Sequence, residues 1–292
     1  MQEQTVYHPT HQFLVCVDSD GCVFDTMEIK HKECFCPAAI EHFDLQPVSK
    51  YARDAWDFVN LYSKWRGIHR LPSLIKVLDL LSERAEVRER GFTPPSLNGL
   101  RQYIQQGGLL SNEGLKRHLA LHPDDIDIQK TLAWSLDVNE RIGRVVRGIP
   151  PFPHVREALE GISRHADIVV VSATEQRAAE REWEEHGLAE LTVAIKGQES
   201  GNKQQIIASM KDAYPAHHVI MVGDAPGDMQ AAHANGALFY PIRPDQEADS
   251  WEESKEGFAA FLSEKYAGAI EEDIIRRFSV LLPSAPPWKT IP

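Results

Sequence analysis

Two carboxylate side chains, Asp18 and Asp20, stand two positions apart near the N-terminus, and a glycine follows them. They come directly after the apolar run 13–17, which predicts a short strand buried on both faces, as in a parallel sheet. Open α/β sheets bind ligands at the carboxyl ends of their strands, so acids placed there could act on a substrate. A turn rich in Asp and Gly is the alternative, because both residues are common in turns.

Three later segments place polar residues at the ends of predicted elements. Ser172 ends the apolar run 168–172, and Lys203 opens a predicted helix. Asp224 follows the apolar run 219–222 through a glycine, with Asp228 four positions further on. Cleavage of a phosphate ester needs a nucleophile, an acid for the leaving group, and positive charge near the transferring phosphoryl group. These residues could supply all three if they converge in the fold.

In this order, the four motifs resemble those of the haloacid dehalogenase superfamily of phosphohydrolases. The resemblance implies that Asp18 attacks phosphorus to form an aspartyl-phosphate, and that Asp20 protonates the departing oxygen and then activates water. It also implies that Lys203 pairs with the phosphate. An aspartate at position 20 argues for an oxygen ester, since relatives that cleave other bonds carry an aromatic or a small residue there.

A magnesium ion is the cofactor that the resemblance implies. Two carboxylates near one anion repel it, and Mg²⁺ is a hard cation that takes oxygen ligands. The expected ligands are Asp18, the backbone carbonyl of Asp20, and Asp224, with Asp228 as a further ligand or as an orienting residue. A helix start with Asp224 as its N-cap is the structural alternative.

Ser172 is expected to bind substrate. Its hydroxyl and the following amides, including that of Ala173, can hold a phosphate oxygen at a helix N-terminus. A serine in that position is also a common helix cap, and Thr174 competes with it for that role.

Lys203 lies 21 residues before Asp224 and begins a predicted helix. A cation there opposes the helix dipole, so a local structural reason for it is hard to find. Lys196, at the end of the preceding predicted strand, is the rival. Two residues depart from the pattern of many relatives: Cys22 stands in place of threonine, and Gln204 in place of proline.

The elements that must position these residues predict two domains. Residues 1–26 and 150–292 alternate strands with helices, which predicts an α/β core with a Rossmann-like parallel sheet. Residues 27–149 show helical patterns only and predict an inserted all-helical domain, with helices at 47–62, 72–87, 94–104, 113–121 and 125–146. The resemblance implies that this insertion is a cap over the active site. The core strands are expected at 13–17, 168–172, 191–195, 219–222 and 237–240, and the proline-rich tail 283–292 is expected at the surface.

The predicted helical domain carries a basic and aromatic cluster between residues 53 and 70. Arg66 and Arg70 in this cluster are candidate substrate-binding residues for an anionic substrate. A solvated helix face with tryptophans packed inside explains the same cluster.

Composition limits the partners. The 292-residue chain has a formal net charge of −12, which argues against a nucleic-acid binder. No apolar run approaches the roughly 20 residues that span a bilayer, and the polar N-terminal stretch lacks a signal-peptide core. We therefore expect a cytoplasmic protein, monomer or homodimer, without membrane contact. Cys34 and Cys36 are expected as free thiols rather than a metal site, since no second Cys or His pair stands at a supporting spacing.

The sequence thus predicts a magnesium-dependent phosphohydrolase that cleaves the phosphate monoester of a small metabolite. A phosphomutase, which returns the group to a sugar, uses the same intermediate and is one alternative. A non-catalytic relative that keeps the fold to bind a ligand is another, although such relatives usually lose one of the acids.

Overall fold

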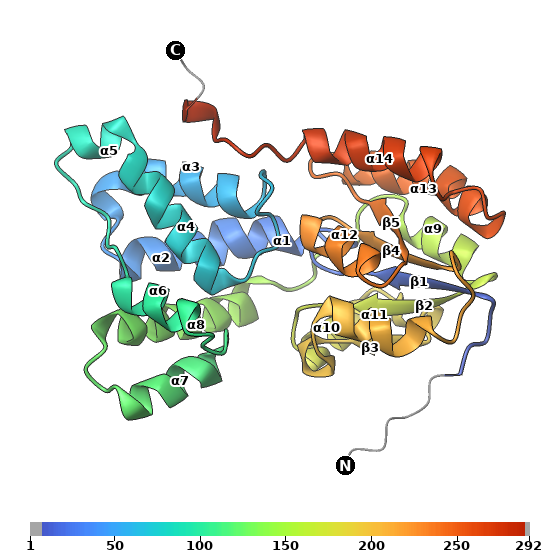
Figure 1. The fold of residues 1–292 in the computed structure, drawn as a ribbon, viewed down its shortest axis with the longest axis horizontal. Helices are drawn as coiled ribbons and strands as arrows, with labels where there is room; N and C mark the ends of the chain where they lie inside the picture. Colours follow the sequence, from blue (N-terminus) through green and yellow to red (C-terminus); the bar gives the residue numbers. More distant parts are fainter. Residues whose placement is uncertain (1–7, 290–292) are drawn as a thin grey trace. The chain divides into compact units, whose positions relative to one another are not determined.

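The computed structural model describes residues 8–289, which divide into two compact units. The first unit contains the described residues up to Thr26 together with Gly148–Leu282. The second contains Met27–Arg147 together with the described residues from Pro283 onward. Figure 1 labels the helices and strands of both units along the chain. Within residues 8–289, every helix is too short or too polar to traverse a lipid bilayer.

A parallel sheet organises the first unit, with five strands among the described residues in the order β3-β2-β1-β4-β5 (Figure 1). Val17 lies in register with Val170 of β2 and with Val222 of β4, so the three central strands end at the same edge. The strands are β1 Phe13–Val17, β2 Ala166–Val171, β3 Ala194–Lys196, β4 Val219–Gly223 and β5 Leu238–Pro241. The predicted α/β fold with a Rossmann-like parallel sheet is confirmed.

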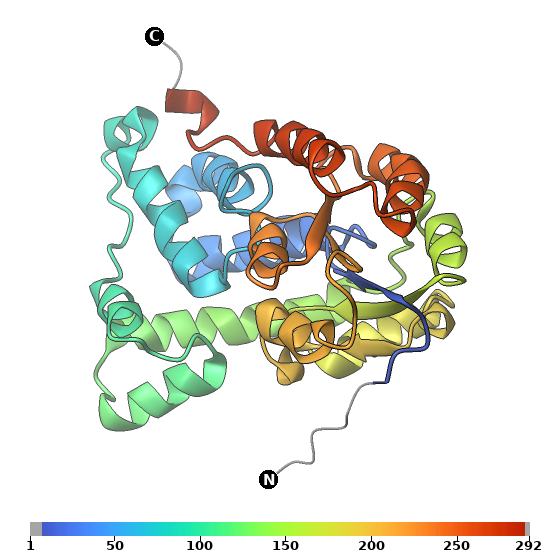
Figure 2. The same cartoon turned by 45° about the vertical axis from the view of Figure 1, so that its right-hand side comes forward.

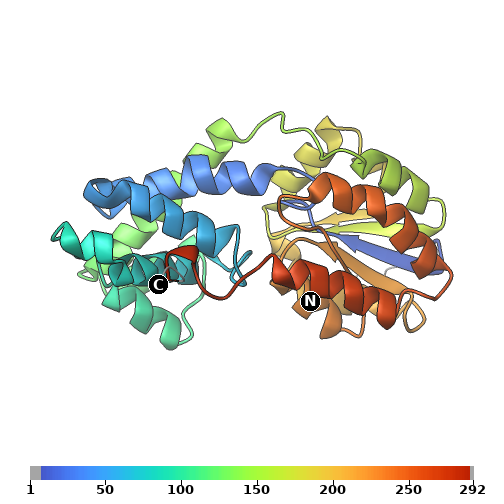
Figure 3. The ribbon, with the colours of Figure 1, turned by 90° about the horizontal axis from the view of Figure 1, so that it is seen from above.

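Helices cover both faces of this sheet (Figure 3). Alternate residues of β1 point to opposite faces. Val15 and Val17 pack in a core with α9 and α13, whereas Leu14 and Cys16 pack in a core with α11, α12 and α14. The helices of this unit are α9 Val155–Ile162, α10 Gln176–Glu185, α11 Lys203–Lys211, α12 Pro226–His233, α13 Glu247–Leu262 and α14 Ala269–Val280. Burial on both faces explains why the strands are continuous apolar runs.

The edge strand β3 differs from the prediction. The sequence predicts a strand over 191–195, but the structure has a 3₁₀ turn at Ala189–Leu191 and a strand only at Ala194–Lys196. The Thr192 hydroxyl donates a hydrogen bond to the Ala189 carbonyl at 2.8 Å and stabilises the turn. An edge strand pairs on one side only, so local hydrogen bonds of this kind can shorten it.

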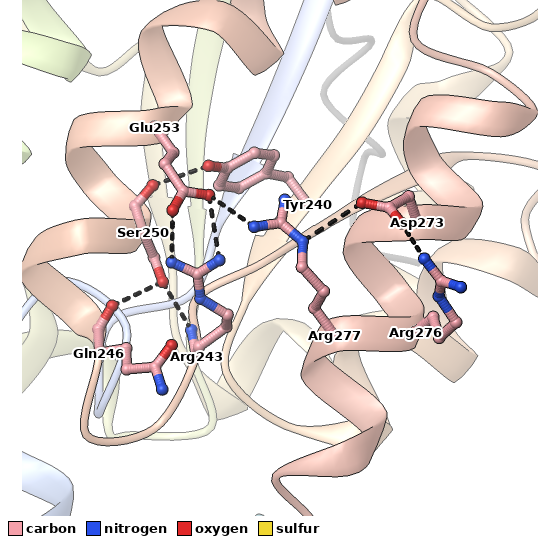
Figure 4. A network of polar contacts seen from close by, with 8 residues as sticks. All are labelled: Tyr240, Arg243, Gln246, Ser250, Glu253, Asp273, Arg276 and Arg277. Carbon is pink, nitrogen blue, oxygen red and sulfur yellow. Dashed lines mark hydrogen bonds and ion pairs between the residues drawn. The ribbon is translucent and has the colours of Figure 1, made fainter.

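A charged network joins the carboxyl end of β5 to the last two helices (Figure 4). The Arg243 guanidinium donates two hydrogen bonds to the carboxylate of Glu253 on α13, at 3.0 and 2.8 Å. Arg277 on α14 reaches the same carboxylate at 3.1 Å and pairs with Asp273 at 3.3 Å. A bidentate pair with a buried arginine fixes its geometry as well as its charge.

Helices joined by turns and loops make up the second unit, and no strand occurs among its described residues. Its core contains the indole rings of Trp56 and Trp134, whose centroids lie 6.1 Å apart in an edge-on arrangement. Helices α7 and α8 pack against each other (Figure 2). The elements are α1 Thr26–Ile29, a π-helix Lys30–Phe35, α2 Cys36–His42, α3 Ser49–Asn60, α4 Arg70–Glu83, α5 Ala85–Glu89, α6 Asn98–Gln105, α7 Asn112–Leu121 and α8 Ile126–Val145.

Two predicted helices of this unit have different bounds. The helix predicted to start at Pro94 begins at Asn98, because Leu97 adopts a left-handed conformation with φ 49° that a helix cannot continue through. The helix predicted over 72–87 is two helices that meet at Arg84, an extended residue whose guanidinium pairs with Asp54 and Glu86 at 2.9 Å.

The segment after Leu282 packs on the second unit, whereas the sequence assigned it to the α/β core. The Trp288 ring meets Phe58 edge-on at 5.6 Å, and the Arg84 guanidinium lies 4.5 Å from its centroid. The carbonyl of Pro283 accepts a hydrogen bond from the Lys64 amide at 3.2 Å. The aromatic and cation–π contacts of Trp288 decide where this segment lies. The proline-rich composition of the segment does not indicate these contacts.

Replacing Trp288 by alanine should destabilise the helical unit. The ring is half-buried, so the expected loss is about 2 kcal/mol, below the roughly 3–5 kcal/mol typical of a fully buried aromatic ring. Hydrogen–deuterium exchange should show faster exchange in α3 and α4. Leu121→Ala, at an exposed position of the same unit, is the control and should leave exchange unchanged. Equal exchange in Trp288→Ala and the wild type would contradict the packing role.

Candidate active site

Buried carboxylates from neighbouring strands meet at the carboxyl edge of the sheet. Asp18 follows β1 and Asp224 follows β4, and these strands pair in register. Carboxylate oxygens of Asp18, Asp224 and Asp228 lie within 4.8 Å of one another. The three residues are 5%, 1% and 1% exposed, respectively. The structure thus brings together three of the four residues that the sequence proposed as metal ligands, and Asp20 is not in this group of carboxylates.

Lys203 lies between two of these acids. Its Nζ atom is 2.6 Å from Asp18 Oδ2 and 2.5 Å from Asp228 Oδ1. Helix α11 begins at Lys203, as the sequence predicts, and Asn202 caps it by accepting from the Gln205 amide at 2.9 Å. The lysine ammonium group can only donate, so it takes no part in capping the helix and binds the two carboxylates instead.

Burial and neighbouring charges shift the pKa values of Asp18 and Lys203. Burial raises the pKa of Asp18 well above its ordinary value; Lys203 opposes this rise, and Asp228 and Asp224 add to it. Burial alone would lower the pKa of Lys203, but attraction to Asp18 and Asp228 raises it above its ordinary value. The lysine therefore stays protonated and binds two of the three carboxylates, Asp18 and Asp228. Excess negative charge in a buried site favours the binding of a cation.

Asp20 lies in a tight turn after β1. Gly21 has φ 74°, a left-handed conformation that glycine adopts without strain, and its amide donates to the Phe24 carbonyl at 2.8 Å. One carboxylate oxygen of Asp20 accepts a hydrogen bond from the Thr26 hydroxyl. The other accepts from the Thr174 hydroxyl at 2.7 Å. Sequence reasoning missed Thr26 and considered Thr174 only as a helix cap.

Ser172 follows β2 and is buried at the same edge of the sheet. Its amide donates to the Lys196 carbonyl at 2.9 Å, and its hydroxyl accepts from the Thr174 amide at 3.1 Å. Helix α10 begins at Gln176, with Glu175 as its N-cap and no side-chain cap bond. Because Glu175 occupies the N-cap, neither Ser172 nor Thr174 caps α10. Ala173, which follows the serine, is exposed.

Arg66 and Arg70, the candidate substrate-binding residues of the helical unit, have partners within that unit. Arg66 is buried and donates to the Leu61 carbonyl at 2.8 Å. Arg70 donates to Asn139 Oδ1 at 2.7 Å and lies over the Phe35 ring at 5.0 Å. Burial lowers the pKa of Arg70 to about 10. These contacts support the structural alternative for both arginines, and their role toward substrate stays a prediction.

Gly223 gives Asp228 the space that its position requires. A Cβ atom at Gly223 would lie 2.5 Å from Asp228 Oδ2 and 2.6 Å from its Cβ and Cγ atoms. Asp228 Oδ2 also accepts from the Ala225 amide at 3.0 Å, which fixes the carboxylate over the start of α12. The glycine before Asp224 is therefore needed for packing.

Replacing Gly223 by alanine should displace Asp228 and disturb the acidic group. Overpacking of this kind typically costs about 1–3 kcal/mol. We expect a lower melting temperature and a smaller increase of that temperature on adding Mg²⁺, both measured by calorimetry. Gly227→Ala is the matched control, because a Cβ atom there meets nothing within 4 Å. Unchanged melting and Mg²⁺ response in Gly223→Ala would contradict this account.

A second charged group lies within the helical unit. Lys32 Nζ is 3.0 Å from Glu28 Oε1 and 3.3 Å from the Tyr62 hydroxyl. Burial raises the pKa of Asp57 to about 6, while Lys32 opposes the rise and Glu28 adds to it. The folded chain therefore keeps Asp57 neutral up to a higher pH than the unfolded chain does.

Replacing Asp57 by asparagine should stabilise the protein in a pH-dependent way. The folded pKa of about 6 lies above the ordinary value, so Asp57 costs the wild type stability as pH rises from about 4 through about 6. Melting temperatures should differ most above pH 6, with Asp57→Asn higher, and converge near pH 4. The exposed Asp124→Asn should show no such pH-dependent gain. A constant difference across this range would contradict the raised pKa.

A family model described as haloacid dehalogenase-like hydrolase matches residues 103–240. The matched stretch contains Ser172, Lys203, Asp224 and Asp228, and it begins after the first acidic motif, which holds Asp18 and Asp20. No curated protein matches the chain.

Solved structures with similar folds share little sequence with this chain. A candidate phosphoglycolate phosphatase from Lactobacillus delbrueckii is 14% identical, with 80% of this chain and 87% of that chain covered and a TM-score of 0.49. A haloacid dehalogenase-like hydrolase from Streptococcus pneumoniae is 14% identical, with 85% and 98% covered and a TM-score of 0.46. A candidate β-phosphoglucomutase from Bacteroides vulgatus is 12% identical, with 90% and 93% covered and a TM-score of 0.42.

Proposed function

The chain belongs to the haloacid dehalogenase-like hydrolases, and from that premise we propose that it is a magnesium-dependent phosphatase. Its proposed substrate is the phosphate monoester of a small metabolite. The observation that carries the proposal is the buried group in which Lys203 bridges Asp18 and Asp228 beside Asp224. This group combines a nucleophile, a cation and further acids at the edge where open α/β sheets bind ligands.

The donor set fits a hard divalent cation. Asp18, Asp224 and Asp228 offer carboxylate oxygens only, which suits Mg²⁺. Lys203 offsets part of their negative charge, because its ammonium group binds Asp18 and Asp228. A bound Mg²⁺ would supply positive charge that draws the phosphoryl oxygens toward Asp18 and offsets repulsion between anions.

In the proposed first step, an Asp18 carboxylate oxygen bonds to phosphorus while the bond from phosphorus to the ester oxygen breaks. Hydrogen bonds from the Ser19 amide at 2.8 Å and from Lys203 hold this carboxylate in one orientation. Lys203 also carries the positive charge that a transferring phosphoryl group requires. Asp20 gives its proton to the departing oxygen, so the product alcohol leaves neutral.

In the proposed second step, water attacks the aspartyl-phosphate. Asp20, now ionised, takes a proton from that water as the new bond to phosphorus forms. The bond between phosphorus and Asp18 breaks, which releases inorganic phosphate and restores the carboxylate. One acid thus serves both steps in opposite directions, as microscopic reversibility of the proton transfer allows.

Replacing Asp18 by asparagine should abolish phosphate release, because a neutral amide cannot form the aspartyl-phosphate. The expected fall in kcat is at least about 10³-fold with p-nitrophenyl phosphate and Mg²⁺. Circular dichroism should show an intact fold, since the substitution removes a charge from an overly acidic buried group. Asp212→Asn, at an exposed position after α11, is the matched control and should keep full activity. Retained phosphate release in Asp18→Asn would exclude this nucleophile.

A panel of phosphorylated metabolites that includes sugar phosphates separates the proposed phosphatase from a phosphomutase. Both reactions use an aspartyl-phosphate, but the mutase returns the group to a sugar. Release of free phosphate supports the proposed function, whereas isomerised sugar phosphate without free phosphate supports the mutase. No turnover of any ester with Mg²⁺ would support a ligand-binding relative.

A further inference from the structure

Both carboxylate oxygens of Asp20 are held by threonine hydroxyls. Thr26, at the start of α1, donates to Oδ1. Thr174, in the loop after β2, donates to Oδ2 at 2.7 Å. Asp20 and Thr174 are both partly exposed, so the bond stands at the open edge of the site rather than in the core. An exposed carboxylate without such bonds would sample several rotamers.

The backbone of Thr174 is fixed on both sides. Its amide donates to Ser172 Oγ at 3.1 Å, and its carbonyl accepts from the Gln198 amide at 2.9 Å. As a β-branched residue, threonine also has restricted χ1 freedom. The hydroxyl is therefore presented to Asp20 from a rigid loop.

A helix-capping role does not explain this hydroxyl. Helix α10 has Glu175 at its N-cap and no side-chain cap bond. The Thr174 hydroxyl instead reaches across 154 positions of sequence to Asp20. Neighbouring strands make this possible, since β1 and β2 pair in register up to Val17 and Val170.

We propose that Thr174 is a positioning residue, whose hydroxyl holds the Asp20 carboxyl group in the orientation that delivers a proton to the leaving oxygen. This role rests on the proposed function, in which Asp20 is the general acid. A general acid contributes about 10²–10⁴-fold only when it lies within hydrogen-bond reach of the leaving oxygen. Small misplacements of such a group lower the rate of the step it serves.

The test compares two aryl esters that differ only in a nitro group. Phenyl phosphate has a basic leaving group and needs the proton, whereas p-nitrophenyl phosphate has a weakly basic one and needs it less. The ratio kcat/KM reports on the steps up to release of the phenol, before water attacks. Thr174→Val removes the hydroxyl and keeps the shape, whereas Thr174→Ser keeps the hydroxyl.

For Thr174→Val we expect kcat/KM to fall about tenfold or more with phenyl phosphate and by less than about threefold with p-nitrophenyl phosphate. Thr174→Ser should restore most of the loss. The matched control is Thr192→Val, which removes a hydroxyl bonded to the Ala189 carbonyl away from the acids. This control should leave kcat/KM unchanged with both phenyl phosphate and p-nitrophenyl phosphate.

An equal fall with both esters in Thr174→Val would show a merely structural effect and overturn the positioning role. Unchanged kcat/KM with both esters would overturn it as well. In either case the wild type still releases phosphate, so the proposed function stands. Absence of phosphate release by the wild type from both esters would instead remove the proposed function, and this role with it.

Discussion

The parallel pairing of β1 with β2 and β4 is the constraint on which the active site depends. These strands end at the same edge of the sheet. The residues that follow them therefore lie close together, although they are far apart in the sequence. Asp18, Ser172 and Asp224 each directly follow one of the three strands. Burial of the strands on both faces makes that register costly to change, since a slip would move apolar side chains out of the core.

The same edge concentrates charge that a folded protein would ordinarily avoid. Taking carboxylates out of water is costly unless partners compensate for it. Here Lys203 binds Asp18 and Asp228, and the buried Asp224 lies within the same group. Functional sites often keep such unfavourable arrangements, which the surrounding core holds in place. The absence of a side chain at Gly223 is part of this arrangement, because Asp228 occupies that space.

The helical unit shows how a cluster of suggestive residues can have a structural explanation. Arg70 is bound to Asn139 and lies over Phe35, while Trp56 is buried beside Trp134. Side chains that stand close in sequence and resemble a substrate site are here largely used for packing within the unit. The C-terminal segment packs on the same unit through Trp288. The proline-rich composition around Trp288 does not indicate this packing.

The sequence alone determined the fold class, the positions of the central strands and the residues that meet at their ends. Those features follow from local patterns: apolar runs bounded by turn residues, and acids at set distances from them. Only the tertiary structure decided the partners of these residues. The Thr174 hydroxyl donates a hydrogen bond to Asp20, 154 positions away in the sequence. Leu97 adopts a left-handed backbone conformation, so the helix begins only after it. Trp288 packs on Phe58 of the helical unit. Contacts of this kind depend on which surfaces folding brings together, and no short stretch of sequence contains that information.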